Sequence, residues 1–113
     1  MPRAIGVKRA TEMFLSGRKV VAEEAVAIGL LSRLVEPEDV DGAAEALARA
    51  LARGPAQVLR DAKRMIAESP ALTLAEQLDL ERDKVAEHVA APDFEEGVSA
   101  FIEKRRAIFP SAQ

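Results

Sequence analysis

The sequence has no cysteine, tryptophan or tyrosine, and His88 is its only histidine. Without cysteine there are no disulfides, thiolate zinc sites or cysteine nucleophiles, and one histidine cannot form a histidine metal cluster. No apolar run approaches the roughly 18 residues needed to cross a bilayer. These absences exclude several common classes of metal site, nucleophilic enzyme and membrane protein.

The chain also lacks a strong charge of either sign. It has 16 Lys and Arg against 19 Asp and Glu, for a formal net charge of −3. This balance gives no electrostatic reason to expect a nucleic acid or an acidic membrane as partner. The first six residues have no apolar core typical of a signal peptide, so a cytoplasmic location is expected.

What the sequence does have is alanine, 22 residues in a chain of 113, with abundant Leu, Glu and Arg. All four are strong helix formers, so the composition predicts a mostly helical protein. The length suits one domain. Small side chains bury little area each, which favours a core that a partner completes.

Single Gly and Pro residues divide the chain and set the expected element boundaries. The apolar spacing predicts helices over residues 4–15, 22–28, 40–52, 55–68, 73–89 and 93–106. Gly17 is expected to end the first of these helices. The last helix is expected to begin at Asp93. Residues 18–21 and 30–35 are predicted to form two short strands around residues 22–28. The predicted fold is therefore mostly α, with one small strand–helix–strand unit.

Two segments carry the pattern of a capping box, in which a side chain and a carboxylate three residues later satisfy free backbone N–H groups. Thr73 and Glu76 form the first, and Asp93 and Glu96 the second. Both predict a helix start.

Few residues suggest chemistry. There is no phosphate-binding glycine motif and no Ser–His–Asp arrangement to argue. The neighbours of His88 suggest an inert surface position near a helix end, and Glu81, which lies on an apolar stripe, is expected to form a structural ion pair. The charged residues between Val58 and Ile66 are expected to face mostly away from the apolar stripe.

Residues 101–109 concentrate two phenylalanines and three cations. One interpretation is a solvated helix end with apolar anchors. The other is a nucleotide contact, in which Phe101 stacks on a base and Lys104, one turn later, meets a phosphate. The residues alone leave both interpretations open.

The order of motifs resembles the C-terminal part of the enoyl-CoA hydratase/isomerase family, also called the crotonase family. The specific signature is the run at residues 93–105, an acidic pair and glycine followed by the letters AFIEKR. Residues 13–18, residues 22–25 with Gly29 and Leu30, and Pro55 with Lys63 match earlier family blocks. The resemblance covers essentially the whole chain.

The resemblance implies acyl-CoA thioesters as substrates, with a thioester enolate stabilised by two backbone N–H groups in an oxyanion hole. In the family those groups and the catalytic glutamates lie upstream of the segment that resembles this chain. We therefore expect no catalytic, cofactor-binding or metal-binding residues here, and a chain that is inactive alone. No cofactor is expected beyond coenzyme A as part of the substrate.

The resemblance also implies that residues 1–36 end the family's spiral core and that residues 37–113 form a helical oligomerisation region. Family members assemble as trimer-based homo-oligomers, and Phe101 and Lys104 match positions that contact the CoA nucleotide. The alternative is a non-catalytic helical assembly module that self-associates or complements a partner. The expected first helix, apolar on most sides, favours this alternative.

Overall fold

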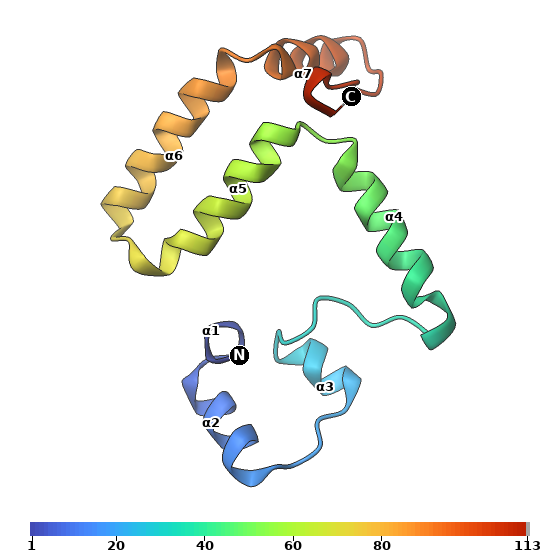
Figure 1. Ribbon diagram of the computed structural model, residues 1–113, viewed down its shortest axis with the longest axis vertical. Coiled ribbons are helices and arrows are strands. Elements are labelled where there is room, and N and C mark those ends of the chain that lie inside the picture. Colours follow the sequence, from blue (N-terminus) through green and yellow to red (C-terminus); the bar gives the residue numbers. More distant parts are fainter. Residues whose placement is uncertain (113) are drawn as a thin grey trace. The chain divides into compact units, whose positions relative to one another are not determined.

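A computed structural model describes residues 1–112 (Figure 1). The chain divides into two compact units, Met1–Ala43 and a second that begins at Ala44. Within the described residues every regular element is helical. None of these helices is both long and apolar enough to cross a membrane.

The first unit contains α1 (Pro2–Ile5), α2 (Val7–Ser16), α3 (Ala22–Ala27) and a 3₁₀ turn, η1 (Pro37–Asp39). The single helix expected over residues 4–15 is interrupted because Gly6 adopts φ 82° and ψ 155°, which no α-helix contains. Gly17 ends α2 with a left-handed φ of 61°, as predicted. The prediction that Gly17 ends the helix was therefore correct, but the interruption at Gly6 was not predicted.

The predicted strand–helix–strand unit is not present in residues 1–112, and that prediction was wrong. A strand requires a neighbour to pair with its backbone groups. The N–H groups of Leu30 and Leu31 instead donate to the carbonyl of Ala25, at 2.8 and 3.1 Å. Arg18 bridges Glu12 and Glu24, with its shortest contact to Glu24 at 2.6 Å. The two predicted strands, residues 18–21 and 30–35, thus make their contacts with helices and not with each other.

Helix α4 (Val40–Ala52) spans the boundary between the units. The second unit continues with α5 (Ala56–Glu68), η2 (Ser69–Ala71), α6 (Leu74–Val89), α7 (Pro92–Ile102) and η3 (Pro110–Ala112). Helices α5 and α6 lie side by side as an antiparallel pair joined through η2 (Figure 1). Helix α7 contacts α6, and η3 contacts both α5 and α7.

The two predicted capping boxes behave differently. Thr73 and Glu76 form a complete box at the start of α6, as predicted. The N-cap of α7 is Ala91, two residues earlier than the expected Asp93, and Pro92 lies in the first turn. Pro92 is suited to this position because it has no N–H to satisfy. Asp93 therefore lies inside the helix, and its role as a cap was wrongly predicted.

Helix α7 also ends earlier than predicted, at Ile102 rather than near residue 106. The Arg105 N–H donates to the Ala100 carbonyl at 3.0 Å, and the Lys104 N–H to the Phe101 carbonyl at 3.3 Å. Together with a φ of 54° at Lys104, these bonds form a Schellman motif. Sequence reasoning missed this end because glycine, the usual residue of the motif, is absent from it.

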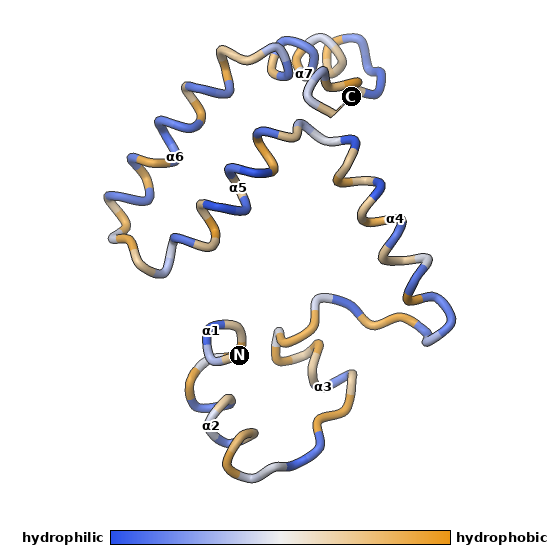
Figure 2. Tube along the Cα trace, in the orientation of Figure 1, coloured by the Kyte–Doolittle hydropathy of each residue, from blue (hydrophilic) through white to orange (hydrophobic). Residues whose placement is uncertain are grey.

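The buried core is small, with only four buried apolar residues among the described ones: Ile5, Ala10, Ala25 and Ala100. The accessible surface is 8916 Å², whereas two separate compact units of these sizes would expose about 7,300 Å². Figure 2 shows hydrophobic residues recurring along the helices of both units. Many of them, including Phe14, Leu15, Ile66 and Leu74, are exposed.

Candidate functional site

An apolar pocket of about 350 Å³ lies in the second unit, among residues of α5, α6, α7 and the C-terminal segment. Its apolar wall is formed by Val58, Phe94, Val98, Phe101 and Phe109. Three polar side chains also line it: Gln57, His88 and Asp93. Its walls are therefore suited to a flat or apolar group with few polar contacts.

A buried carboxylate lies beside this pocket. Asp61 is only 6% exposed, and its Oδ2 accepts a hydrogen bond from Gln57 Nε2 at 3.0 Å. His88 Nε2 lies 3.4 Å from the same oxygen, and the His88 side chain is 17% exposed. His88 is near the end of α6 as expected, but it is half-buried and faces Asp61 instead of solvent. The surface assignment of His88 was wrong.

The position of Asp61 also corrects a prediction about α5. Asp61 was expected to point away from the apolar stripe, yet it is the one buried residue of the helix. Val58, Asp61, Ala62 and Met65 follow the helical spacing i, i+3, i+4 and i+7, so they share one face. That spacing was readable in the sequence and would have identified Asp61 as a buried carboxylate.

Glu81 does not form the ion pair expected from its place on an apolar stripe. It is exposed, and its Oε1 accepts a hydrogen bond from Gln77 Nε2 at 2.7 Å. Among residues 1–112 no cation lies within ion-pair distance of it. Since α6 leaves much of its apolar stripe exposed, solvent reaches this carboxylate and no cation is needed.

Phe101 lies in the last turn of α7, and Lys104 lies just beyond the end of that helix. Phe101 lines the pocket, yet it is 84% exposed, so much of its ring is free to contact a ligand. Lys104 is exposed and lies in the turn after the helix rather than on the helical face of Phe101. In the described part of the chain Lys104 forms no ion pair. Phe101 and Lys104 therefore share one turn, in which the Lys104 N–H donates to the Phe101 carbonyl.

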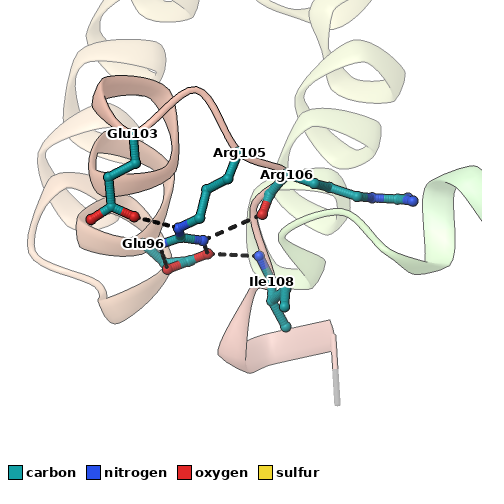
Figure 3. A network of polar contacts seen from close by, with 5 residues as sticks. All are labelled: Glu96, Glu103, Arg105, Arg106 and Ile108. Carbon is teal, nitrogen blue, oxygen red and sulfur yellow. Dashed lines mark hydrogen bonds and ion pairs between the residues drawn. The ribbon is translucent and has the colours of Figure 1, made fainter.

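The residue after Lys104 is held by carboxylates (Figure 3). Arg105 Nη1 and Nη2 donate to the two oxygens of Glu96 at 2.6 and 2.9 Å, and Arg105 Nε donates to Glu103 at 2.6 Å. The Ile108 N–H donates to Glu96 Oε1 at 2.7 Å. Hydrogen bonding to Arg105 and then to Ile108 lowers the pKa of Glu96 to about 2. The same carboxylates raise the pKa of Arg105.

A second anchor holds the chain after Phe109. The Ser111 N–H donates to Asp93 Oδ1 at 3.1 Å, and the Ser111 hydroxyl donates to Asp93 Oδ2. The Ala56 N–H in turn donates to Ser111 Oγ at 2.8 Å. Asp93, unsuited to capping at its position, thus fixes the C-terminal segment to α7 and to the start of α5. None of these contacts was predictable from local spacing, because 18 residues separate Asp93 from Ser111.

Comparison with known proteins identifies the family of this chain. The enoyl-CoA hydratase/isomerase family model matches residues 1–112. The chain belongs to the enoyl-CoA hydratase/isomerase family. It is 38% identical over 109 residues to 1,2-epoxyphenylacetyl-CoA isomerase of Escherichia coli, covering 96% of this chain and 42% of that protein. It is 33% identical over 109 residues to trans-2-decenoyl-[acyl-carrier-protein] isomerase of Streptococcus mutans, covering 96% and 41%.

Solved structures of the enoyl-CoA hydratase/isomerase family agree with this assignment. The enoyl-CoA hydratase of Bacillus anthracis, solved at 1.8 Å, superposes with a TM-score of 0.90 at 31% identity, over 97% of this chain and 43% of that one. The sequence resemblance to the family is thereby confirmed, as is its helical crotonase-type architecture. The chain spans about two-fifths of the length of the curated relatives it matches.

Within residues 1–112, no group of three or more His, Asp or Glu side chains could hold a metal ion. The two most buried carboxylates, Asp61 and Asp93, are already occupied by protein partners. The ring of Phe101 and the cation of Lys104 are not engaged in this way, since Phe101 is 84% exposed and Lys104 forms no ion pair among residues 1–112.

Proposed function

We propose that this chain contributes oligomer assembly and part of the CoA contact to an enoyl-CoA hydratase/isomerase family protein that acts on acyl-CoA thioesters. Phe101 stacks on the adenine of CoA, and Lys104 contacts its phosphates. The enolate-stabilising N–H pair and the catalytic glutamates would be supplied by other parts of such a protein. The chain itself contributes no catalytic residue.

The conformation of Lys104 carries this proposal. A left-handed backbone costs an L-residue roughly 1–2 kcal/mol, and glycine would avoid this cost. Strain of this kind is concentrated at functional positions. Lys104 keeps a cation there and leaves it without an ion pair in the described residues. Phe101, three residues earlier, leaves most of its ring exposed. A nucleotide offers both a base to stack on and phosphates to pair with.

The binding expected of the chain alone is weak. Stacking of one base on an aromatic ring contributes about 1–3 kcal/mol, and a hydrogen bond to a charged group about 1.5–3 kcal/mol. Even together these place the dissociation constant near the millimolar range. The assay must therefore resolve weak binding residue by residue, which amide NMR does.

The test is a titration of the ¹⁵N-labelled chain with CoA up to about 10 mM. Amide shifts are expected in the segment that carries Phe101 and Lys104, and not in the first unit. Pantetheine, which lacks the nucleotide, is expected to leave the same amides unmoved. Lys104→Gln should weaken the shifts, whereas Arg106→Gln, which removes a neighbouring unpaired cation, should have little effect. An unchanged spectrum, or equal shifts with pantetheine, would overturn the nucleotide contact.

The carrier of the acyl group is part of the same proposal, because the relatives differ in it. The Escherichia coli relative is named for a CoA substrate, and the Streptococcus mutans relative for an acyl-carrier-protein substrate. The acyl-carrier protein has the phosphopantetheine arm but no adenine. A free aromatic ring beside an unpaired cation therefore supports CoA over the protein carrier for this chain.

The exposed apolar surface favours a second function, assembly. The accessible surface exceeds that of two compact units by about 1,600 Å². One partner of a standard protein interface contributes roughly 800 Å². We assign assembly to the helices of residues 37–113, in a trimer-based homo-oligomer, with self-association of the chain alone as the non-catalytic alternative.

A further inference from the structure

The turn that carries Lys104 is closed by an ion-pair cluster, which we name the Glu96 clamp: Glu96, Glu103 and Arg105 with the backbone N–H of Ile108 (Figure 3). Glu96 projects from the second turn of α7, and both of its oxygens bind the Arg105 guanidinium. One of these oxygens also binds the Ile108 N–H. A single carboxylate on a rigid helix thus fixes the chain at residues 105 and 108.

Lys104 lies between two residues of the clamp. Glu103 before it and Arg105 after it are bonded to each other through their side chains, at 2.6 Å. The Arg105 guanidinium is further bonded to Glu96, which holds the chain after the turn against α7. Lys104 is therefore the member of this turn with a free side chain and a strained backbone. The clamp holds residue 104 in place without using its cation.

We propose that Glu96 and Arg105 are positioning residues, which hold residue 104 in its left-handed conformation and so present the Lys104 ammonium to the phosphates of CoA. Neither residue needs to touch the ligand. The guanidinium is already bonded to two carboxylates, so it is a poor phosphate ligand itself. This inference rests on the proposed nucleotide contact of Lys104.

The competing interpretation is that the clamp only fastens the C-terminal segment to α7. The two interpretations differ in how mutations combine. If Glu96 acts through Lys104, removing Glu96 matters for CoA binding only while Lys104 is present. If Glu96 has a purely structural role, its loss changes affinity by the same factor with or without Lys104. A double-mutant cycle separates these cases.

The experiment uses the full 113-residue chain and CoA as the probe, with affinity measured by amide NMR titration. Glu96→Gln removes the charge of the clamp, and Glu95→Gln removes the same charge from the neighbouring exposed position as a matched control. Lys104→Gln is expected to weaken CoA binding about tenfold. Glu96→Gln should weaken it several-fold, Glu95→Gln by less than twofold, and Glu96→Gln combined with Lys104→Gln no more than Lys104→Gln alone.

A second readout follows the backbone without any ligand. A positive φ brings the amide proton close to the Hα of the same residue, which gives a strong intraresidue NOE. This NOE at Lys104 is expected to weaken in Glu96→Gln and to persist in Glu95→Gln. Arg105→Lys, which keeps the charge but loses the two-pronged geometry, should repeat the effect if Glu96→Gln does not fold.

The outcomes separate the two proposals. If Lys104→Gln weakens binding and Glu96→Gln does not, the clamp has no positioning role, but the nucleotide contact stands. If the effects of the two substitutions multiply, the clamp is only a fastening. If Lys104→Gln has no effect on CoA binding, both the contact and the positioning role are overturned.

Discussion

Lys104 is the residue at which the local conformation and the residue type disagree most. Among the described residues it is the single non-glycine with a positive φ. Glycine at the same position would satisfy the same two Schellman bonds without the steric cost of a Cβ. The lysine therefore needs a reason other than stability, and an anion contact supplies one.

Replacing Lys104 by glycine should make the chain more stable and poorer at binding CoA. Relief of the left-handed strain is expected to raise the free energy of unfolding by about 1 kcal/mol. Urea denaturation measures this change in stability, and a CoA titration measures the loss of CoA affinity. Arg106→Gly is the control, because residue 106 has no positive φ to relieve. A Lys104→Gly chain less stable than the parent would contradict the strain argument.

Glu96 makes stability depend on pH in a defined window. Its pKa in the folded chain is about 2, below the 4.5 of an unperturbed glutamate. A lowered carboxyl pKa stabilises the folded state above the ordinary pKa, and this contribution is lost as the pH falls towards the folded value. The stability difference between the parent and Glu96→Gln should therefore be constant above about pH 5 and shrink between pH 4.5 and pH 2.

Denaturant unfolding of both chains at several pH values measures this difference. Glu95→Gln serves as the control, since Glu95 is exposed and forms no ion pair in the described residues. A difference between the parent and Glu96→Gln that stays constant from pH 6 down to pH 2.5 would contradict the ion pair seen in Figure 3.

At the scale of elements, the starts of α6 and α7 look alike in sequence but differ in the structure. Thr73→Ala should cost about 1 kcal/mol, because it removes the hydroxyl that caps the Glu76 N–H. Thermal or urea unfolding measures this loss of stability. Thr73→Ser, which keeps the hydroxyl, should lower the free energy of unfolding much less. Equal stability of Thr73→Ala and the parent would show that the box contributes nothing.

Asp93→Ala should act at a distance from its own helix start. It removes the acceptor of both Ser111 hydrogen bonds, so the Ser111 amide should lose protection from hydrogen exchange. The amides in the interior of α7 should keep theirs, because Asp93 does not cap this helix. Ser111→Ala should reproduce the loss in the C-terminal segment. Fraying of α7 alone would restore the capping interpretation.

Local sequence signals predicted most helices of this chain. Gly17 ends α2, the spacing from Val40 to Leu51 gives α4, and Thr73 starts α6. The failures arise where backbone groups find partners, or adopt conformations, that apolar spacing does not describe. Residues 30–35 read as a strand, but Leu30 and Leu31 bond to the end of α3. The end of α7 was missed because a lysine occupies a position that usually holds glycine.

The candidate site was predictable only in part. The resemblance to the enoyl-CoA hydratase/isomerase family pointed to Phe101 and Lys104, and their ligand role stays a prediction. The pocket beside Phe101, with Asp61 and His88 at its edge, was not foreseen. It depends on α5 and α6 packing together, whereas sequence spacing describes one helix at a time. The i, i+3, i+4 spacing around Asp61 was the one local signal.

At the scale of the whole molecule, the chain exposes more surface than its size requires. Exposed apolar side chains of this extent are typical of an interface. We expect the isolated chain to associate at micromolar concentration, with sedimentation velocity over a dilution series as the measurement. Association should strengthen with kosmotropic salt, which favours apolar burial. A monomer that stays monodisperse throughout would contradict the assembly role.

Intermolecular NOEs between CoA and the phenylalanine rings report whether Phe101 stacks on the adenine. The chain has four phenylalanines, so selective ¹³C labelling of their rings gives four separate reporters. In the presence of CoA, the adenine protons should show NOEs to the ring of Phe101 and none to Phe14. NOEs that favour Phe14, or no NOE to any ring despite saturating CoA, would contradict the stacking of Phe101 on adenine.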